Sequence, residues 1–216
     1  ASKKSGENTQ WLAEFLLSYK KNFNDVHKLT FLAGATFEQF LSQYVRGTAK
    51  GFLSDVTGFN NMHSGDNLNG DDVYSYKDRN RLNGFLGRIN YDFMNKYLLT
   101  ASFRYDGTSR FSKDHKYAFF PSVAFAWRMS EEPFIKKFES ISDLKLPIGF
   151  GQLGNQGIAN YQTIQTLSAG GSAVFGNSLA QGVVQARLPN PGLKWETTAE
   201  SNIGVDFGFF NNRITG

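Results

Sequence analysis

One motif in the sequence has a spacing that could bind a dinucleotide. Residues 149–154 read Gly-Phe-Gly-Gln-Leu-Gly, a G-x-G-x-x-G pattern that follows a predicted strand. A dinucleotide site also needs a helix directly after the motif and an acidic residue about 20 residues further on. Here NQGIANYQ follows, and residues 170–177 contain no acid. The glycines therefore indicate strand curvature or close approach of a side chain, and we predict no cofactor-binding residue.

Metal ligands and catalytic groups have equally little support. The histidines His27, His63 and His115 lie in predicted turns or loops without metal-ligand spacing, and we interpret them as solvent-exposed. Asp66–Asp72 faintly resembles a calcium loop, but Leu68 stands at the third EF-hand position, so a solvated loop is favoured. No Ser/His/Asp set has a supporting context. We therefore expect no catalytic or metal-ligating residue and no enzymatic activity.

The strand carboxylates do not define a catalytic pair of the kind that glycoside hydrolysis needs. We interpret them as polar residues on a wet face, either hydrated or paired with arginines. The acids are Glu14, Glu196, Glu200 and Asp206, and the arginines are Arg88, Arg104 and Arg128.

Aromatic residues in predicted loops could stack on sugars or contact a partner protein, and loop packing is an equal alternative. They are Tyr74, Tyr76, Phe111, Tyr117 and Tyr161. Substrate-binding residues are therefore left unassigned.

Composition narrows the class of protein. The 216 residues include 21 phenylalanines and 22 glycines but only 5 prolines and no cysteine. This aromatic, glycine-rich composition favours β structure. The net charge of +4 is spread along the chain and forms no basic patch, so we expect no nucleic-acid partner. No apolar run approaches the roughly 18 residues of a membrane helix.

The side chains of Leu82–Met129 alternate strictly. In its three runs most aromatic residues hold odd positions, among them Phe85, Tyr105 and Trp127, and the charged residues Arg88, Asp92, Arg104 and Arg128 hold even positions. A period of two indicates strands with one dry and one wet face, and three such runs predict an antiparallel meander. Because paired residues share a face, Phe93 should pair with Tyr97. The turn is then Met94–Lys96, with Asn95 or Lys96 at positive φ.

The same alternation predicts the other elements. Dry residues are odd-numbered in every strand except 143–152, where they are even. The predicted strands are 10–20, 27–38, 81–93, 97–106, 118–129, 143–152 and 194–210, with an eighth beginning after a two-residue turn at Asn211-Asn212. Residues 1–9 carry no pattern, and residues 39–50 form a short helix or extend the strand. Ser130–Ser142 predicts a short helix with Ser130 as its N-cap. The predicted turn at 21–26 is short, whereas loops at 39–80, 107–117 and 153–193 are longer.

Two architectures fit these faces. Apart from Arg81 at the start of one strand, the dry faces carry no charged residue. This is expected in the core of a soluble β-sandwich and on the lipid face of a transmembrane barrel, where a basic residue costs roughly 2–4 kcal/mol at mid-bilayer. Long strands, alternating short and long connections, and aromatics near strand ends favour the barrel. Those aromatics are Trp11, Tyr19, Tyr97, Tyr105, Phe119, Trp127, Trp195 and Phe209. We predict an all-β fold, an antiparallel up-and-down transmembrane β-barrel segment of about eight strands, with the sandwich as the alternative.

Five segments resemble the barrel of the SusC/RagA family of TonB-linked (TonB-dependent) outer-membrane proteins. They are LNGFLGRINYDF (82–93), KYLLTASFRYDGTSRF (96–111), FFPSVAFAWRMSEEPF (119–134), ISDLKLPIGFGQLGNQGIANYQ (141–162) and NPGLKWETTAESNIGVDFGFFNNRITG (190–216). Pro147 departs from the expected strand pattern because it cannot donate a hydrogen bond, which places the local ladder in doubt.

The resemblance implies that residues 1–216 are part of a TonB-dependent receptor barrel of about 22 strands with an N-terminal plug. We expect the plug and the C-terminal strands to lie outside this chain. The implied function is energised nutrient uptake across the outer membrane of a Gram-negative, Bacteroidetes-like cell. The implied partners are a SusD-like surface lipoprotein, TonB through a segment outside this chain, outer-membrane lipid, and a glycan or peptide substrate. A passive porin or structural barrel and a soluble β-sandwich binding module are the alternatives.

Overall fold

A computed structural model describes residues 1–24, 26–54, 56–58, 60–67 and 72–216. The chain divides into two compact units. The first comprises Ala1–Ala13 and Glu38–Arg81, and the second comprises Glu14–Phe37 and Leu82–Gly216. Within the described ranges, no helix is long and apolar enough to cross a membrane, which has no bearing on crossing by strands.

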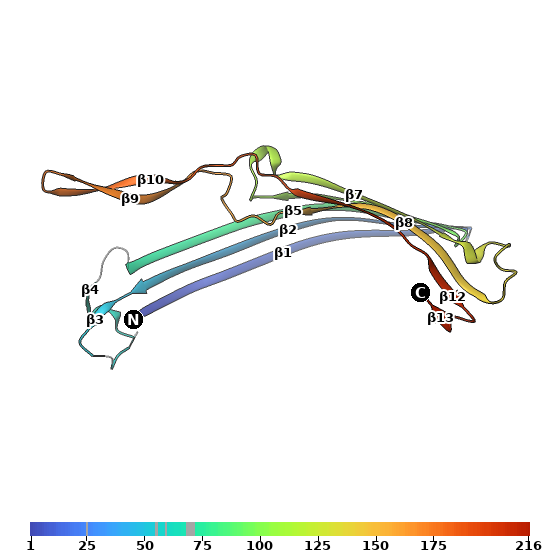
Figure 1. Cartoon of the computed structure of the whole chain (residues 1–216), viewed down its shortest axis with the longest axis horizontal. Helices are drawn as coiled ribbons and strands as arrows, with labels where there is room; N and C mark the ends of the chain where they lie inside the picture. Colours follow the sequence, from blue (N-terminus) through green and yellow to red (C-terminus); the bar gives the residue numbers. More distant parts are fainter. Residues whose placement is uncertain (25, 55, 59, 68–71) are drawn as a thin grey trace. The chain divides into compact units, whose positions relative to one another are not determined.

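Antiparallel strands make up almost all regular structure of the described residues, which confirms the all-β prediction (Figure 1). The main sheet has the hydrogen-bonded order β1-β2-β5-β6-β7-β8-β12-β13, and β11 also pairs with β8. Its strands are β1 (Ser2–Phe23), β2 (His27–Thr48), β5 (Val73–Phe93), β6 (Tyr97–Thr108), β7 (Tyr117–Arg128), β8 (Ile141–Asn155), β11 (Glu196–Ile203), β12 (Asp206–Phe209) and β13 (Ile214–Thr215). Two hairpins stand apart, β3 (Lys50–Phe52) with β4 (Gly65–Asn67) and β9 (Thr166–Phe175) with β10 (Ser178–Arg187). Short 3-10 turns are η1 (Met62–Ser64), η3 (Lys113–His115) and η4 (Met129–Glu131).

The register of the second unit confirms the predicted meander. Phe93 pairs with Tyr97, so the turn between β5 and β6 has the three predicted residues. Asn95 has a φ of 57°, as predicted, and Met94 also has a φ of 57°. The side chain of Asn95 accepts a hydrogen bond from Lys28 Nζ at 2.6 Å, and this contact helps to hold the left-handed backbone.

The change of parity in β8 is also confirmed. Val123 of β7 pairs with Phe150 of β8, and Phe207 of β12 pairs with Leu144 of β8. Odd residues of β7 and β12 therefore share a face with even residues of β8. After the turn at Asn211-Asn212, Ile214 pairs with Phe209. The even-numbered Ile214 therefore shares a face with the odd-numbered Phe209, as a two-residue turn requires.

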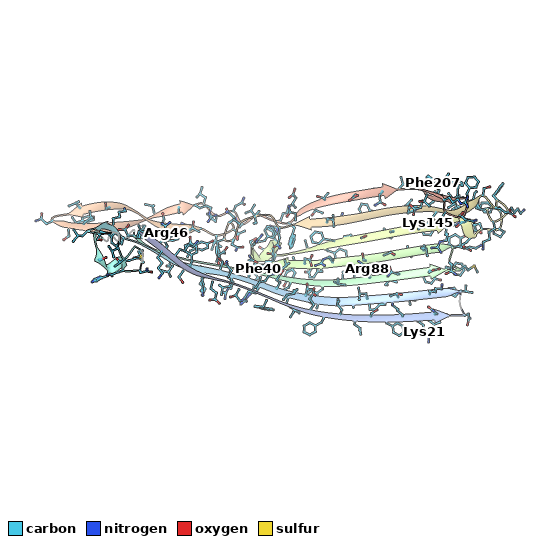
Figure 2. The ribbon with its side chains drawn as sticks, turned by 90° about the horizontal axis from the view of Figure 1, so that it is seen from below. Lys21, Phe40, Arg46, Arg88, Lys145 and Phe207 are labelled. Atoms are coloured by element: carbon cyan, nitrogen blue, oxygen red, sulfur yellow. The ribbon has the colours of Figure 1, made fainter. Side chains whose placement is uncertain are left out.

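These pairings define two faces of the second unit, whose paired strands lie side by side in Figure 2. The aromatic face carries apolar side chains such as Phe85, Tyr91, Leu99, Phe125 and Phe150. The polar face carries the alternate residues, among them Arg88, Arg104 and Ser122.

The aromatic face is open in this chain. Phe119 and Phe15, for example, are 55% and 66% exposed. A sandwich core would bury such side chains, and the only described hydrophobic residues that are buried are Ala49, Phe111, Phe120 and Trp195. The soluble sandwich is therefore not favoured.

In the first unit, regular strand extends further than the sequence pattern predicted. The unpatterned residues 2–9 belong to β1, residues 39–48 extend β2 rather than forming a helix, and residues 73–80 belong to β5. The Ala1 amino group donates to the Ala49 carbonyl at 2.7 Å, and Gln10 Nε2 donates to Glu38 Oε1 at 2.7 Å. Strand structure therefore continues through residues 2–9, which carry no large apolar side chain.

Two predictions in the second unit are wrong. Residues 130–142 form the 3-10 turn η4 and successive tight turns instead of a capped helix, and the Ser130 hydroxyl donates to Asp143 Oδ1 at 3.1 Å rather than capping. Residues 153–193 are not one long loop, because they contain the end of β8 and the β9–β10 hairpin.

The expected disturbance of the strand hydrogen bonds at Pro147 is confirmed. The predicted strand 194–210 is interrupted at Gly204 and Val205, between Ile203, which pairs with Ile148, and Asp206, which pairs with Lys145. Pro147 has no N–H to donate there, although its carbonyl still accepts from Gly204 N at 2.9 Å. The ladder therefore breaks opposite the proline and resumes on either side.

Candidate functional site

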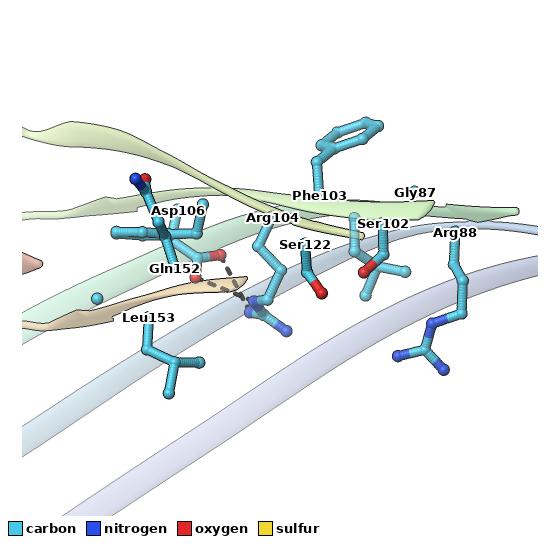
Figure 3. Close-up of a pocket in the computed structure, with 12 residues that line it drawn as sticks. Gly87, Arg88, Ser102, Phe103, Arg104, Asp106, Ser122, Gln152 and Leu153 are labelled. Carbon is cyan, nitrogen blue, oxygen red and sulfur yellow. Dashed lines mark hydrogen bonds and ion pairs between the residues drawn. The ribbon is translucent and has the colours of Figure 1, made fainter. Parts of the chain in front are cut away.

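A depression of about 350 Å³ lies against the polar face between β5 and β8. Figure 3 shows Arg88, Ser102, Arg104 and Ser122 pointing to the same side of the sheet, while Phe103 points to the other side. The alternation of neighbouring residues along the strands produces this separation. Leu86, Phe120 and Leu153 add apolar surface to the lining, and the arginines and serines supply its hydrogen-bonding groups.

The two arginines of the depression differ in their contacts. Arg104 Nε and Nη2 both donate to the Asp106 carboxylate at 3.0 Å, a bidentate pair formed along one strand. Arg88 is exposed and makes no hydrogen bond or ion pair with another described residue. Its guanidinium therefore offers a free fork of donors, which matches carboxylate, phosphate or sulfate oxygens.

A small loop core closes one end of this face. Phe111 and Phe120 pack on Trp195 with ring centroids 5.6 and 5.5 Å away. All three side chains are buried, and Leu82, Ala118, Ile158 and Leu193 pack around them. A side chain at Gly154 would meet the Phe120 ring at 2.0 Å, so only glycine lets the ring lie there. We call Phe111, Phe120 and Trp195 the loop core.

Hydrogen bonds join the segments around the loop core. Trp195 Nε1 donates to the Lys116 carbonyl at 2.9 Å, and Ser112 Oγ donates to the Pro191 carbonyl at 2.7 Å. Arg110 donates to Asn160 Oδ1 at 3.0 Å and to the Gln156 carbonyl at 3.1 Å. Loops from three places in the sequence are thus fixed together at this end of the sheet.

The opposite end of the second unit, which we call the short-connection end, carries the β1–β2, β5–β6, β7–β8 and β12–β13 connections, and backbone hydrogen bonds join neighbouring ones. Met94 N donates to the Val26 carbonyl at 2.7 Å, and Phe210 N donates to the Ser140 carbonyl at 2.9 Å. The predicted alternation of short and long connections is confirmed only in part: residues 94–96 form a short turn and residues 156–195 a long excursion, but the β7–β8 connection at 129–140 is longer than the β6–β7 connection at 109–116.

At the short-connection end, the Glu132 carboxylate accepts hydrogen bonds from three side chains. It accepts from Lys96 Nζ at 2.8 Å, Tyr97 Oη at 2.9 Å and Trp127 Nε1 at 3.2 Å. The hydrogen bond from Lys96, followed by that from Tyr97, holds the pKa of Glu132 below its ordinary value. Sequence patterns did not indicate this cluster; the available signal was the acid pair Glu131-Glu132 directly after an aromatic strand end.

The residues considered as sites from sequence are dispersed, and several lie elsewhere than expected. His27 is half-buried in β2, with Nδ1 2.7 Å from Tyr91 Oη, and His115 is half-buried, whereas His63 is exposed as expected. Tyr74 and Tyr76 belong to β5 and Tyr117 to β7, rather than to loops. Phe111 is in the loop core, and so is Trp195, which was expected among the aromatics near strand ends that favour a membrane barrel. Tyr161 is an exposed loop residue.

The acids do not pair with the arginines that sequence suggested. Asp206 forms an ion pair with Lys145, and Glu196 accepts a hydrogen bond from Asn155. Arg104 pairs with Asp106, and Arg128 donates to the Asn95 carbonyl at 3.3 Å. Polar residues on these strands are thus satisfied mainly by close neighbours.

The glycine motif is structural. Residues 149–154 all belong to β8, and turns rather than a helix follow in residues 156–165. Most of the Asp66–Asp72 loop lies outside the described residues. Among the residues that are described, no group of three or more His, Cys, Asp or Glu side chains could hold a metal ion.

The two-faced sheet, with short connections at one end and interlocked loops at the other, defines the wall of an antiparallel β-barrel. The family model described as "TonB dependent receptor-like, beta-barrel" matches residues 4–216. The chain therefore belongs to the TonB-dependent receptor β-barrel family. This is a family of receptors and transporters, not a family of enzymes.

Individual relatives agree with this assignment. "TonB-dependent receptor P26" of Formosa agariphila is 37% identical over 208 residues, which are 94% of this chain and 20% of that protein. "TonB-dependent receptor SusC" of Bacteroides thetaiotaomicron is 41% identical over 150 residues, 66% of this chain and 14% of that protein. The solved structure of the RagAB peptide transporter superposes with a TM-score of 0.87 at 25% identity, covering 99% of this chain and 23% of that one. The chain thus spans about a fifth of the length of its curated relatives.

Proposed function

We propose that this chain is a wall segment of an outer-membrane, TonB-dependent importer of nutrients, either glycans or peptides. The observation that carries the proposal is the open aromatic face, because exposed rings along paired strands of the second unit need an apolar environment. The strands are long enough for it, since β6 and β7 have 12 residues each and a membrane-crossing strand needs about 9–11.

The polar face then lines the transport path. Its hydrogen-bonding groups suit a hydrated cargo, and the unpaired Arg88 would attract anionic groups on that cargo. The loop core fixes loops at one end of this face, where the barrel mouth would be. Energy would come from TonB acting through a segment outside this chain.

We further propose that the β9–β10 hairpin contacts a SusD-like surface lipoprotein. Its apolar side chains are largely exposed: Leu167 is 63%, Val174 is 69% and Leu179 is 67% exposed. Val174 and Leu179 pair across the hairpin and so share one face. An ordered hairpin with a bare apolar face on the long-loop side needs a protein surface to cover it.

Site-directed labelling of the intact protein tests the wall assignment. Single cysteines from 97 to 106 would be exposed to competing lipid-soluble and water-soluble thiol probes in membranes. We expect labelling from lipid at 99, 101 and 103, and from water at 100, 102 and 104. Protection of 99, 101 and 103 from both probes would identify a protein core on that face and refute the proposal.

Uptake distinguishes an importer from a passive porin. We expect import of a glycan or peptide by the intact protein to stop when TonB is removed, because a plugged barrel needs energy to open. Uptake that persists without TonB would favour the porin.

For the lipoprotein contact, Val174→Asp together with Leu179→Asp should abolish co-purification of the lipoprotein. Ser168→Asp, on the same hairpin, is the matched control.

A further inference from the structure

The connection between β7 and β8 begins on the aromatic side of the sheet. Tyr97 and Trp127 pair across β6 and β7 at the strand ends, and their rings stack with centroids 6.4 Å apart. Both rings direct their polar atoms to Glu132, which is only 9% exposed. Glu132 therefore anchors the connection at the tips of two side chains of the aromatic face.

The residues that follow Glu132 present bulky apolar groups to the surroundings. In residues 133–138, which we call the strap, Phe134 is 50% and Phe138 is 58% exposed. Backbone hydrogen bonds from Lys136 N to the Glu132 carbonyl and from Phe138 N to the Ile135 carbonyl, at 3.0 and 2.9 Å, fold the strap into tight turns. The two phenylalanines are thus held in place on an ordered backbone.

The strap also carries two lysines with different surroundings. Lys136 Nζ forms an ion pair with Glu131 at 2.7 Å. Lys137 is exposed and has no ion-pair partner among the described residues. Exposed aromatics beside an unpaired lysine form the combination that is stable at a membrane surface, where rings enter the acyl boundary and the ammonium reaches lipid phosphates.

We propose that the strap is a membrane-interface anchor that binds anionic phospholipid at the short-connection end of the barrel wall. Phe134 and Phe138 lie in the boundary between headgroups and acyl chains, continuous with the rings of Tyr97 and Trp127, and Lys137 contacts a headgroup phosphate. Glu132 fixes the strap to the wall. This inference rests on the proposed function, in which the aromatic face contacts lipid.

Spin labels on the intact protein in phosphatidylethanolamine/phosphatidylglycerol vesicles test the position of the strap. Single nitroxides would be placed at 134 and 138, at 99 on the aromatic face, and at 212 in the neighbouring turn. Collision with oxygen, relative to a water-soluble nickel chelate, should dominate at 134, 138 and 99 and be low at 212. If 134 and 138 resemble 212 while 99 stays lipid-exposed, the anchor is refuted and the wall assignment stands. If 99 also resembles 212, both are refuted.

The lysine contact has its own test. Lys137→Gln should lower the thermal unfolding midpoint of the intact protein in vesicles that contain phosphatidylglycerol, and leave it unchanged in pure phosphatidylcholine. Lys113→Gln, in the loops at the other end of the second unit, is the matched charge control and should give no lipid-dependent difference. An equal shift for Lys137→Gln in both vesicles would overturn the headgroup contact.

Discussion

Tyr97 and Trp127 stand opposite each other on neighbouring strands and both donate a hydrogen bond to the same oxygen of Glu132, at 2.9 and 3.2 Å. The carboxylate therefore joins two strand ends to the connection that leaves the second of them. Lys96, in the preceding turn, neutralises its charge at 2.8 Å. One acid thus holds together a turn, two strands and the strap.

This cluster predicts a pH dependence of stability. The pKa of Glu132 is lowered in the folded protein, chiefly by the hydrogen bond from Lys96. Its contribution is therefore complete above the unfolded value of about 4.3 and is lost as the pH falls through the lower folded value. Glu132→Gln should unfold more readily than wild type at pH 7, and the difference should shrink below about pH 4. Thermal unfolding of the intact wild type and the variant from pH 3 to 7 measures this pH dependence. A difference in unfolding midpoint that stays constant over the range would contradict the prediction.

A charged residue introduced on the aromatic face should lower the stability of the protein more than one introduced on the polar face. Ala101 lies on the aromatic face, where it pairs with Ile89 and Val123, near the middle of β6. Ala101→Arg should destabilise the protein in a bilayer by about 2–4 kcal/mol. The control Thr100→Arg points to the polar face and loses only the hydrogen bond to Asn90, which is worth about 0.5–1.5 kcal/mol. Denaturant unfolding in vesicles compares them, and equal losses would contradict a lipid-facing side.

Two glycines of the same motif should respond differently to alanine. At Gly154 a new Cβ would meet the Phe120 ring at 2.0 Å, and the ring is confined by Trp195. Gly154→Ala should therefore cost about 1–3 kcal/mol through overpacking. At Gly151 the nearest atoms are those of Ser122 at 3.5 Å, an ordinary contact, so Gly151→Ala should change stability little. Denaturant titration of both variants checks the difference, and similar stabilities would argue against a tight loop core.

The indole hydrogen bond of the loop core should control loop opening. Trp195→Phe keeps an aromatic ring but leaves the Lys116 carbonyl without its donor. The expected cost is about 0.5–1.5 kcal/mol, which corresponds to loop cleavage that is about 2 to 10 times faster. Trypsin cleavage after Arg110, Lys113 and Lys116 under native conditions reports it. Unchanged cleavage would mean that ring packing alone fixes these loops.

Local patterns predicted the central elements because each depends on near neighbours. The alternation in β5, β6 and β7 determined which residues share a face, and that constraint predicted the three-residue turn. The alternation within β8 itself predicted its change of parity. Pro147 predicted the break in its ladder because the missing donor is a property of the residue itself. The resemblance of whole segments to SusC/RagA proteins indicated the TonB-dependent receptor family, whose β-barrel model matches residues 4–216.

Other features were not predicted because they leave only weak patterns in the amino-acid sequence. Strand residues 2–9 carry no apolar side chain, and residues 73–80 mix Val73, Tyr74 and Tyr76 with polar residues, so neither segment shows the alternation of the other strands. The β9–β10 hairpin contains a run of Gly, Ser and Ala that indicated a loop, and Ser130–Ser142 carries helix-start residues but forms tight turns that are tied to the wall through Glu132.

The sequence by itself determined the two faces, the strand parity and the family, because a period of two is imposed by backbone geometry at every residue. Only the tertiary structure brought Phe111, Phe120 and Trp195 into one core and Lys96, Tyr97 and Trp127 onto one carboxylate. Most of those contacts join residues 35 or more positions apart in the chain. They depend on side chains that meet at the ends of strands whose length and register are set by pairing.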